Sequence, residues 1–358
     1  MVEAVRQNAP VPVQKLTSTD AFVIRDVVRA DGAPTLSIGV VRCAPKILQD
    51  GAGWLARSVT YTCASFSIEA SGASAGINAP PDVRAGALAA FDNEMSPSVS
   101  DGTLVLDAAK GVSATDLPGM SAADPRSPDV RDVGPHALAA GIVAASAVAL
   151  GDTSGRRLDG MTVAIEGIDA MGSANALGLL GLIASSGGTV VAFSTAKGAT
   201  IVPDGIDPDG LRSGIEAGDL TSLLGDEPLA ANRLLGADAS LLLVGAKAGV
   251  LEHNGAAYVR ARAVVPWGPV AVTAKALAVL TRSGVVVVPD FLALAGPLLS
   301  WTGPNPTAGN LDGLRELVAG SLVDVFDHDR GAVLGACLRA EAFLGTWVTD
   351  LPFGRPLG

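Results

Sequence analysis

Charged side chains are scarce in this chain of 358 residues, since Asp, Glu, Lys and Arg make up only 17% of it, against roughly 25% in an ordinary soluble protein. The 25 Lys and Arg residues are outnumbered by 36 Asp and Glu residues, which gives a formal net charge of −11. Because an acidic chain is poorly suited to gripping nucleic-acid phosphates, we expect no nucleic-acid partner. The apolar share of 49% excludes a disordered chain, and the length allows two domains with cores of their own.

Paired cysteines are missing as well. Cys43, Cys63 and Cys337 lie far apart and form no CxxC motif, so neither a disulfide framework nor a zinc site is indicated. The histidines show no metal-ligand spacing, and we expect no metal centre. They are His136, His253 and His328.

Long hydrophobic runs are also absent. The longest, 136–150, is rich in alanine and shorter than the ~20 residues that a membrane-spanning helix needs. This run favours a buried helix. The first residues of the chain lack the apolar core of a signal peptide. We therefore expect a cytoplasmic protein without a membrane segment.

The apolar residues that are present follow two different patterns. Residues 18–118 mix short β-rich runs with a helical stretch near 50–60. From about 158 onward, apolar strands alternate with helices, for example strand 161–167, helix 173–185 and strand 189–194. Such alternation predicts a parallel sheet covered by helices on both faces. The β-rich runs of the first region are 21–28, 35–42, 65–70 and 103–109, and later apolar runs are 239–245, 262–267 and 284–290.

These patterns predict an α/β protein with two domains. We place the first domain at 1–133 and the second, Rossmann-like and doubly wound, at 134–335. A helical tail follows at 336–358. The polar, proline-containing segment 121–134 is expected to connect the two domains.

A glycine turn follows the strand at 161–167 and resembles the GxGxxG turn of dinucleotide-binding proteins. Gly167 supplies the tight turn, and Gly172 allows the next helix to pack closely on the strand. The middle glycine, which lets the backbone approach a pyrophosphate, is replaced by Asp169. The two positions that serve the fold are therefore kept, and the position that serves the ligand is not.

The end of the next strand leaves two interpretations open. The acidic residue that would bind a ribose hydroxyl about 20 residues after the turn is missing. Ser194, Thr195 and Lys197 stand there instead and would suit a 2′-phosphate, which favours NADP over NAD. The alternative is a polar strand end without a ligand.

Four segments in this order resemble the glutamate/leucine/phenylalanine/valine dehydrogenase family. Residues 158–176 are similar to the opening of its coenzyme domain, and 190–207 to its second strand and turn. Residues 283–301 resemble its PDF-x-x-NAGG segment, and 53–77 its substrate-domain helix and glycine-rich loop. The resemblance implies an N-terminal substrate and oligomerisation domain, a dinucleotide-binding domain, homo-oligomers, and NAD(P)-dependent oxidative deamination of an amino acid.

The residues that the resemblance assigns to catalysis are largely replaced. Thr62 and Ser74 stand where the family has the lysines that bind the substrate carboxylate and polarise its carbonyl. Asp116 matches the catalytic aspartate, or else it caps a helix. Lys46 and Lys110 are the nearest alternative lysines. The remaining positions assigned to the substrate or nicotinamide cleft are Arg42, Trp267, Leu294 and Pro297.

Three hypotheses follow. The leading one is a divergent family member that has lost the usual deamination and acts as a structural or regulatory homo-oligomer, with a possible protein partner and with no or weak NADP binding. The second is an active NADP-dependent oxidoreductase that acts on the CH–NH₂ group of an amino acid or on an altered substrate. The third is a sensor that binds a small metabolite without converting it.

Overall fold

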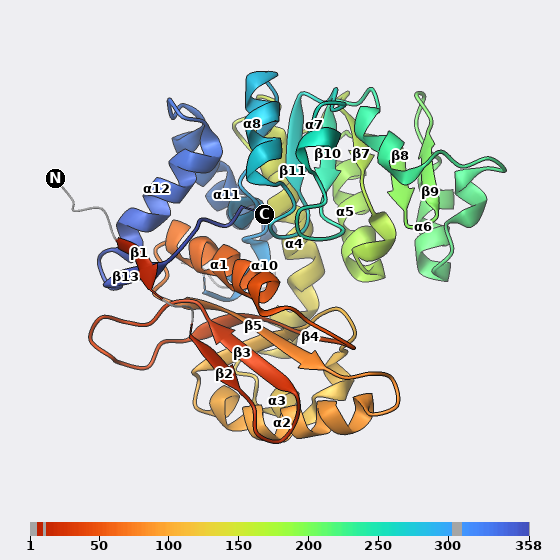
Figure 1. Cartoon of the computed structure of the whole chain (residues 1–358). Helices are drawn as coiled ribbons and strands as arrows, with labels where there is room; N and C mark the ends of the chain where they lie inside the picture. Colours follow the sequence, from red (N-terminus) through yellow and green to blue (C-terminus); the bar gives the residue numbers. More distant parts are fainter. Residues whose placement is uncertain (1–5, 10–11, 303–309, 358) are drawn as a thin grey trace. The chain divides into compact units, whose positions relative to one another are not determined.

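The chain divides into two compact units in a computed structural model that describes residues 6–9, 12–302 and 310–357. The first unit comprises 1–127 and 337–356, and the second comprises 128–336 and 357–358. The predicted domain limits at 133/134 and 335/336 stay a prediction. The α/β class is confirmed, because each unit is built on a sheet with helices packed against it (Figure 1).

The first unit contains a five-stranded sheet in the order β2-β3-β5-β4-β6. Strand β4 runs parallel to β5 and β6, whereas β3 is antiparallel to both β2 and β5. A separate parallel pair joins β1 to β13. The strands are β1 (Arg6–Ala9), β2 (Val13–Lys15), β3 (Ala21–Arg25), β4 (Ser37–Ala44), β5 (Ser71–Asn78), β6 (Leu104–Ala108) and β13 (Asp350–Pro352).

Helices cover both faces of this sheet: α1 lies over one face, with α2 and α3 on the other (Figure 1). The second of these faces carries the core of the unit, where Phe91 and Met95 of α2 meet Val41 and Ile77 of the sheet. Glu94, on the same helix, caps the β2–β3 turn by accepting the N–H groups of Thr17 and Ser18. The helices are α1 (Gln49–Ser65), α2 (Arg84–Ser100), the 3₁₀ turn η1 (Ala114–Asp116) and α3 (Pro118–Ala123).

The predicted glycine-rich loop of the first region is in fact a strand. Residues 72–76 lie inside β5, and the predicted strand at 65–70 is wrong, because α1 ends at Ser65 and β5 begins at Ser71. The glycines serve packing: a Cβ atom at Gly72 would lie 1.8 Å from the carbonyl oxygen of Ala56 in α1. The small residues of β5 therefore let the helix backbone rest directly on the strand.

A buried ion pair ties the C-terminal segment to α1. The Arg57 guanidinium donates to both oxygens of Asp26 at 2.7 and 2.8 Å, and both residues are at most 2% exposed. The same guanidinium also donates to the carbonyl oxygens of Pro352 and Gly354. Because a buried charge is tolerated only when its hydrogen bonds are made, this cluster holds residues 352–354 against the helix.

The second unit contains a six-stranded sheet in the order β12-β11-β10-β7-β8-β9. All neighbouring strands are parallel except β9, which is antiparallel to β8. The strand order reverses between β7 and β10, as in a doubly wound fold, so the Rossmann-like prediction is confirmed. The strands are β7 (Thr162–Ile165), β8 (Thr189–Thr195), β9 (Gly198–Ile201), β10 (Leu241–Val244), β11 (Ala263–Pro266) and β12 (Val286–Val287).

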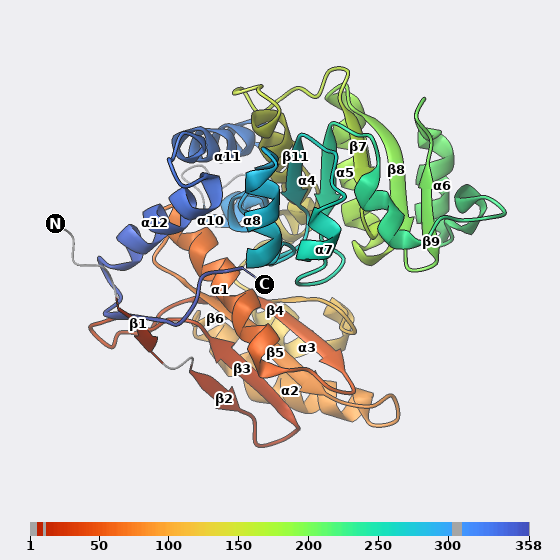
Figure 2. The same ribbon diagram turned by 45° about the horizontal axis from the view of Figure 1, so that its top comes forward.

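Helices connect the strands of this sheet and cover it. Helix α5 packs against α6, and α7 packs against α8; because parallel crossovers are right-handed, the two pairs belong to opposite faces. Figure 2 shows α6 next to the edge strand β9. The helices are α5 (Ser173–Ser185), α6 (Pro208–Ala217), α7 (His253–Ala256), α8 (Ala274–Arg282), α9 (Asp290–Ala293), α10 (Gly296–Thr302) and α11 (Leu311–Phe326), with 3₁₀ turns η2 (Ile168–Ala170), η3 (Thr221–Leu224) and η4 (Ala231–Gly236). Helix α12 (Ala332–Leu344) begins in this unit and continues in the first unit from residue 337.

The apolar run at 136–150 belongs to α4 (Pro128–Ala149). Among the described residues, this is the one helix long and apolar enough to cross a membrane, and 61% of its most apolar stretch is buried inside the protein. It packs against α5, α10 and α11, as a core helix does. The predicted connection at 121–134 contains the boundary between the two units at 127/128. Its second half is helical, because α4 begins at Pro128, and proline fits a first helical position.

Candidate functional site

The glycine turn after β7 adopts the geometry that its sequence predicts. Gly167 has a φ of +64° and Gly172 a φ of +82°, a region that favours glycine. A Cβ at Gly167 would also lie 2.4 Å from the Cβ of Ala246. The Gly167 N–H donates to the hydroxyl of Ser194 at 3.0 Å. Ser194 is thus buried and holds the turn to β8, so its hydroxyl is already used inside the protein.

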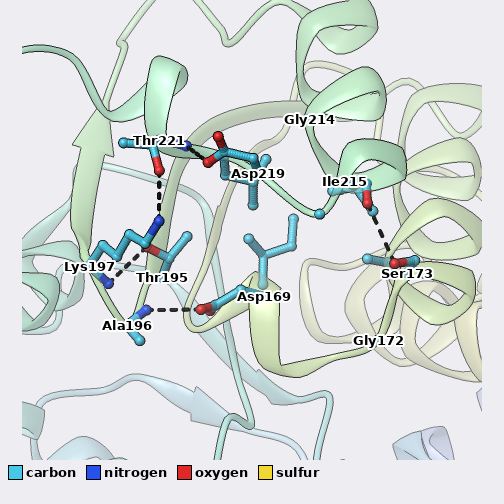
Figure 3. A pocket seen from close by; sticks show the side chains of 14 residues that line it. Asp169, Gly172, Ser173, Thr195, Ala196, Lys197, Gly214, Ile215, Asp219 and Thr221 are labelled. Carbon is cyan, nitrogen blue, oxygen red and sulfur yellow. Dashed lines mark hydrogen bonds between the residues drawn. The ribbon is translucent and has the colours of Figure 1, made fainter.

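A cavity of about 180 Å³ opens beside this turn, at the carboxyl ends of β7 and β8 (Figure 3). Predicted ligand-binding residues Asp169, Gly172, Thr195 and Lys197 line it, whereas Gly167 and Ser194 are not among its lining residues. Buried apolar side chains form part of its wall. These are Ile168, Ala176, Ile215 and Leu220.

The charged groups of the cavity form hydrogen bonds within the protein. The Lys197 ammonium donates to the Thr221 hydroxyl at 2.9 Å, and the Asp219 carboxylate accepts the Thr221 N–H at 2.9 Å. Hydrogen bonds from Thr221, together with the charge of Lys197, lower the pKa of Asp219. The Asp169 carboxylate accepts the Ala196 N–H at 3.1 Å. Two carboxylates and one ammonium thus line the cavity (Figure 3).

The crevice between β7 and β10, where a doubly wound sheet binds the middle of its dinucleotide, is filled by side chains. The Trp267 indole donates to the Glu166 carbonyl oxygen at 2.8 Å, and Trp267 is only 7% exposed. The Glu166 carboxylate accepts the N–H groups of Gly245 and Ala246, both at 3.0 Å. A Cβ at Gly245 would lie 2.6 Å from the Trp267 ring, so the ring is in direct contact with the end of β10.

A strained residue follows this tryptophan. Val270 has a φ of +56°, which is rare for a β-branched side chain, and its N–H donates to the Asp290 carboxylate at 2.7 Å. Asp290 belongs to the PDF motif noted in the sequence, and it is buried. Within the second unit, this aspartate therefore anchors the loop that carries Trp267.

The other two predicted cleft positions of this unit lie at the α9–α10 junction. Leu294 ends α9 and Pro297 lies in the first turn of α10; both are partly buried. Neither is among the residues that line the cavity beside the glycine turn. The neighbouring Gly296 serves packing, because a Cβ there would lie 1.9 Å from the Ala137 carbonyl oxygen of α4.

In the first unit, the residues at the family's lysine positions are buried hydroxyls. Thr62 donates to the Ser58 carbonyl oxygen at 3.1 Å within α1, and Ser74 is fully buried in β5. The guanidinium of Arg42, on the adjacent strand β4, reaches the Ser74 hydroxyl at 3.4 Å. The structure therefore brings Arg42 and Ser74 together, with a cation beside a position where the family has a lysine.

The lysines of this chain do not take the place of the two that the family has at these positions. Lys46 and Lys110 are exposed to solvent, as are the four other lysines. These are Lys15, Lys197, Lys247 and Lys275.

Arg42 carries an uncompensated charge. Burial lowers the pKa of its guanidinium, its Nε is buried without a hydrogen-bond partner, and the described residues show no carboxylate paired with it. We expect Arg42→Met to raise the free energy of unfolding by about 1 kcal/mol, because it removes a desolvated polar group. Urea titration measures this gain. Arg25→Met is the matched control: the pKa of Arg25 is also lowered by burial, but its guanidinium donates to Gln14 at 2.9 Å. An equal change of unfolding free energy in both variants would contradict the interpretation that the Arg42 charge is uncompensated.

Asp116 ends a 3₁₀ turn and forms its capping box. Its carboxylate accepts the Ser113 N–H and an Arg84 guanidinium N–H, both at 2.8 Å. These bonds, led by the one from the Ser113 backbone, lower the pKa of the carboxyl. Since a general base works best with a pKa near the working pH, the lowered pKa makes Asp116 a weaker base. A catalytic role for Asp116 stays a prediction.

A pH-dependent stability is expected from this carboxylate. Its pKa is lower in the folded chain than the ordinary value of about 3.9, so its stabilising effect is present above that value and is lost as the pH falls through the lowered pKa. Asp116→Asn should therefore unfold at a lower temperature than the wild type at pH 6, and the difference should shrink below about pH 4. Thermal unfolding followed by circular dichroism measures both. A difference that stays constant over this range would contradict the prediction.

Comparisons with known proteins agree with this architecture. Residues 132–300 match the family model described as Glutamate/Leucine/Phenylalanine/Valine dehydrogenase. This match supports a relation to the glutamate/leucine/phenylalanine/valine dehydrogenase family over that part of the chain. The chain is 34% identical to the NAD-specific glutamate dehydrogenase A of Halobacterium salinarum over 139 residues. These aligned residues make up 39% of this chain and 31% of that protein. It is 38% identical to the NADP-specific glutamate dehydrogenase A1 of the same organism over 143 residues. These aligned residues make up 39% of this chain and 33% of that protein.

Solved structures of other amino-acid dehydrogenases share the fold over most of the chain. The hetero-hexameric glutamate dehydrogenase of Thermus thermophilus, in its Leu-bound form, superposes with a TM-score of 0.71 at 21% identity, over 91% of this chain and 88% of that one. The L-tryptophan dehydrogenase of Nostoc punctiforme has a TM-score of 0.61 at 17% identity, over 95% and 96% of the two chains. The sequence matches, by contrast, span only about a third of the curated relatives.

Several residues of the cavity are not predicted from the sequence. Ile215 lies in α6, Asp219 follows this helix and Thr221 begins η3, in a segment where the sequence has no motif. The available signal is Gly218, whose φ of +68° ends α6 and turns the chain toward the cavity.

Proposed function

We propose that this chain is a divergent family member that does not catalyse lysine-dependent oxidative deamination, and that it acts as a structural or regulatory homo-oligomer in the cytoplasm. The observation that carries the proposal is the state of the two lysine positions. Thr62 bonds within its own helix, and Ser74 is buried beside Arg42. All six lysines of the chain are exposed to solvent.

The chemistry explains why these replacements matter. Oxidative deamination needs a cation that holds the carboxylate, a lysine that polarises the developing carbonyl, and an acid or base that moves protons. Neither Thr62 nor Ser74 carries a charge, and Asp116 alone does not replace the set. A hydroxyl already bonded inside the protein would also have to break that bond to contact a substrate.

The proposal includes no or weak binding of NADP. A dinucleotide would meet the Asp169 carboxylate at the turn and the Trp267 indole in the crevice beyond it. Lys197, the cation that would favour a 2′-phosphate, lines the cavity together with the carboxylates of Asp169 and Asp219. If a dinucleotide binds, Gly172, Thr195 and Lys197 would contact its adenosine half, and its nicotinamide would supply the hydride chemistry.

A turnover assay tests the proposed loss of deamination. The purified chain is incubated with each of the twenty amino acids and with NAD or NADP, and reduced coenzyme is followed at 340 nm, a wavelength that reports the nicotinamide. The NADP-specific relative from Halobacterium salinarum serves as the positive control. We expect no rate above the protein-free background. A substrate-dependent rate that Asp116→Asn abolishes would overturn the proposal and establish the NADP-dependent or NAD-dependent oxidoreductase instead.

The proposed homo-oligomer has separate support. Large apolar side chains of the first unit are exposed in the single chain, such as Phe353 at 79%, Leu48 at 65% and Val28 at 61%. The Thermus thermophilus neighbour is a hetero-hexamer, which supports assembly through this fold. Multi-angle light scattering should give a mass well above the 35.8 kDa of one chain. If the measured mass is that of one chain at every concentration, the proposed homo-oligomer is contradicted.

A further inference from the structure

A second cavity, of about 410 Å³, lies in the second unit beside β12, an edge strand of the six-stranded sheet. Its wall includes Ala149 of α4 and Leu277 of α8. Helix α4 packs against α5, and α8 covers the face of the sheet opposite to α5. A cavity that touches both helices therefore extends around the edge of β12. It shares no lining residue with the cavity at the glycine turn, and its volume falls within the roughly 300–1,000 Å³ of ordinary ligand pockets.

The edge strand presents an unpaired backbone donor to this cavity. Val286 and Val288 donate their N–H groups toward β11, each at 3.0 Å. Because successive residues of a strand point these groups to opposite sides, the N–H of Val287 points to the free edge. No described residue accepts it, although Val287 lines the cavity and is only 7% exposed. A buried N–H group without an acceptor is unusual in a folded protein, so this position favours a ligand with a carbonyl oxygen.

The rim of the cavity favours a negative charge. Arg330 lines the cavity and is exposed, and no described carboxylate forms an ion pair with it. None of the described lining residues is Asp or Glu, and the nearby Asp327 and Asp329 are exposed and lie outside the lining. The first turn of α12, residues 332–334, also lines the cavity, and the N-terminal end of a helix attracts anions. An arginine without a partner beside such a turn suits a carboxylate.

The rest of the wall is apolar. Apart from Arg330 and Thr281, the described lining residues carry apolar side chains or none. Val287 and Val333 belong to one buried apolar cluster, against which other lining residues pack. A ligand with aliphatic side chains would therefore cover apolar surface and gain free energy from its removal from water. The larger side chains of the wall are Leu277, Val285, Phe326, Val333 and Leu334.

We propose that this cavity binds the free C-terminal end of an apolar peptide, which lies along the edge of β12 as an added strand. The terminal carboxylate pairs with Arg330 at the start of α12. A main-chain carbonyl oxygen of the peptide accepts the Val287 N–H, and its aliphatic side chains cover the apolar wall. Strand addition of this kind takes its affinity from main-chain hydrogen bonds and its specificity from pockets for the side chains.

This inference does not depend on the proposed function, because it uses none of the residues at the glycine turn or the lysine positions. It does give the chemistry of a protein partner: a chain that ends in aliphatic residues with a free carboxylate. A simple aliphatic carboxylate would use Arg330 and the wall, but it would leave the Val287 N–H without an acceptor.

Isothermal titration calorimetry on the full chain tests the proposal with three probes. They are the peptide acetyl-Ala-Val-Val-Leu with a free carboxylate, the same peptide as its C-terminal amide, and octanoate. We expect the free acid to bind at least about 10-fold more tightly than the amide, which lacks the charge. It should exceed octanoate by a similar factor, because octanoate has no main-chain carbonyl for Val287. If the free acid fails to bind, or if the amide or octanoate binds as tightly, the proposal is overturned.

Two variants and a control assign the binding to this cavity. Arg330→Gln removes the rim charge and should weaken the free acid about 10-fold or more. Ala332→Trp should abolish binding by filling the cavity. Arg212→Gln makes the same change of charge at an exposed position of α6 outside the cavity, and should leave binding unchanged. Thermal unfolding checks that each variant is folded, and Arg330→Gln alone decides the test if Ala332→Trp is not. Peptide binding that Arg330→Gln leaves intact would refute the site.

Discussion

An Asp26→Asn variant is expected to lose about 3–5 kcal/mol of unfolding free energy, as is typical when one partner of a buried ion pair is removed. Asp26 is completely buried and pairs with Arg57 at 2.7 Å. The amide would leave the Arg57 guanidinium charged, desolvated and without a counter-charge. The loss is large because the same guanidinium also binds the carbonyl oxygens of residues 352 and 354. The C-terminal segment should loosen together with α1.

Urea titration at constant pH measures this loss, and hydrogen exchange locates it. The control is Glu316→Gln, which breaks the exposed pair between Arg156 and Glu316 at 2.8 Å and should change stability by less than about 1 kcal/mol. A second variant, Arg57→Met, should also destabilise, because it strands the buried Asp26 carboxylate. If Asp26→Asn loses no more unfolding free energy than the surface control Glu316→Gln, the Asp26–Arg57 pair does not hold the C-terminal segment.

Trp267→Ala is expected to cost about 3–5 kcal/mol, the usual range for removing a buried tryptophan. The indole is 7% exposed, contacts Gly245 at the end of β10, and donates to the Glu166 carbonyl oxygen at 2.8 Å. The variant loses this packing and leaves the carbonyl oxygen without its indole partner. It also opens the crevice at the switch point of the sheet.

The milder variant Trp267→Phe separates the two contributions. Phenylalanine keeps most of the apolar contact, so its main loss is the hydrogen bond, and we expect a cost of about 1 kcal/mol. Denaturant titration compares the two variants under identical conditions. A loss in Trp267→Ala no larger than in Trp267→Phe would mean that the ring does not fill the crevice.

Local patterns were enough to predict most of the second unit. The helix at 173–185 was predicted with its observed bounds, because the glycine turn marks its start and apolar residues continue without a break. The strands around it were found from short apolar runs, which a sheet buried on both faces requires. The six-stranded doubly wound sheet follows from that alternation.

The errors in the first region have a common physical cause. The family resemblance predicts a glycine-rich loop at Gly72 and Gly76, and local glycine content, which disfavours strands, does not contradict it. In the structure they lie inside β5, where a side chain would strike α1 or Phe22. Close packing between distant segments decided this conformation. The start of α4 at Pro128 was missed because the polar residues 128–134 look like a linker.

The candidate site, like the fold, is predicted in part by the sequence and decided in part by the tertiary structure. The family, the glycine turn and the replacement of both lysines by Thr62 and Ser74 are determined by the sequence, because each rests on residues close together in the chain. Only the tertiary structure decided what Asp169 does, since its partner Ala196 lies 27 residues away. It also decided that Trp267 closes the crevice against Glu166, 101 residues apart. Side-chain contacts of this length depend on how strands line up at one edge of a sheet, and strand order is not a local property of the sequence.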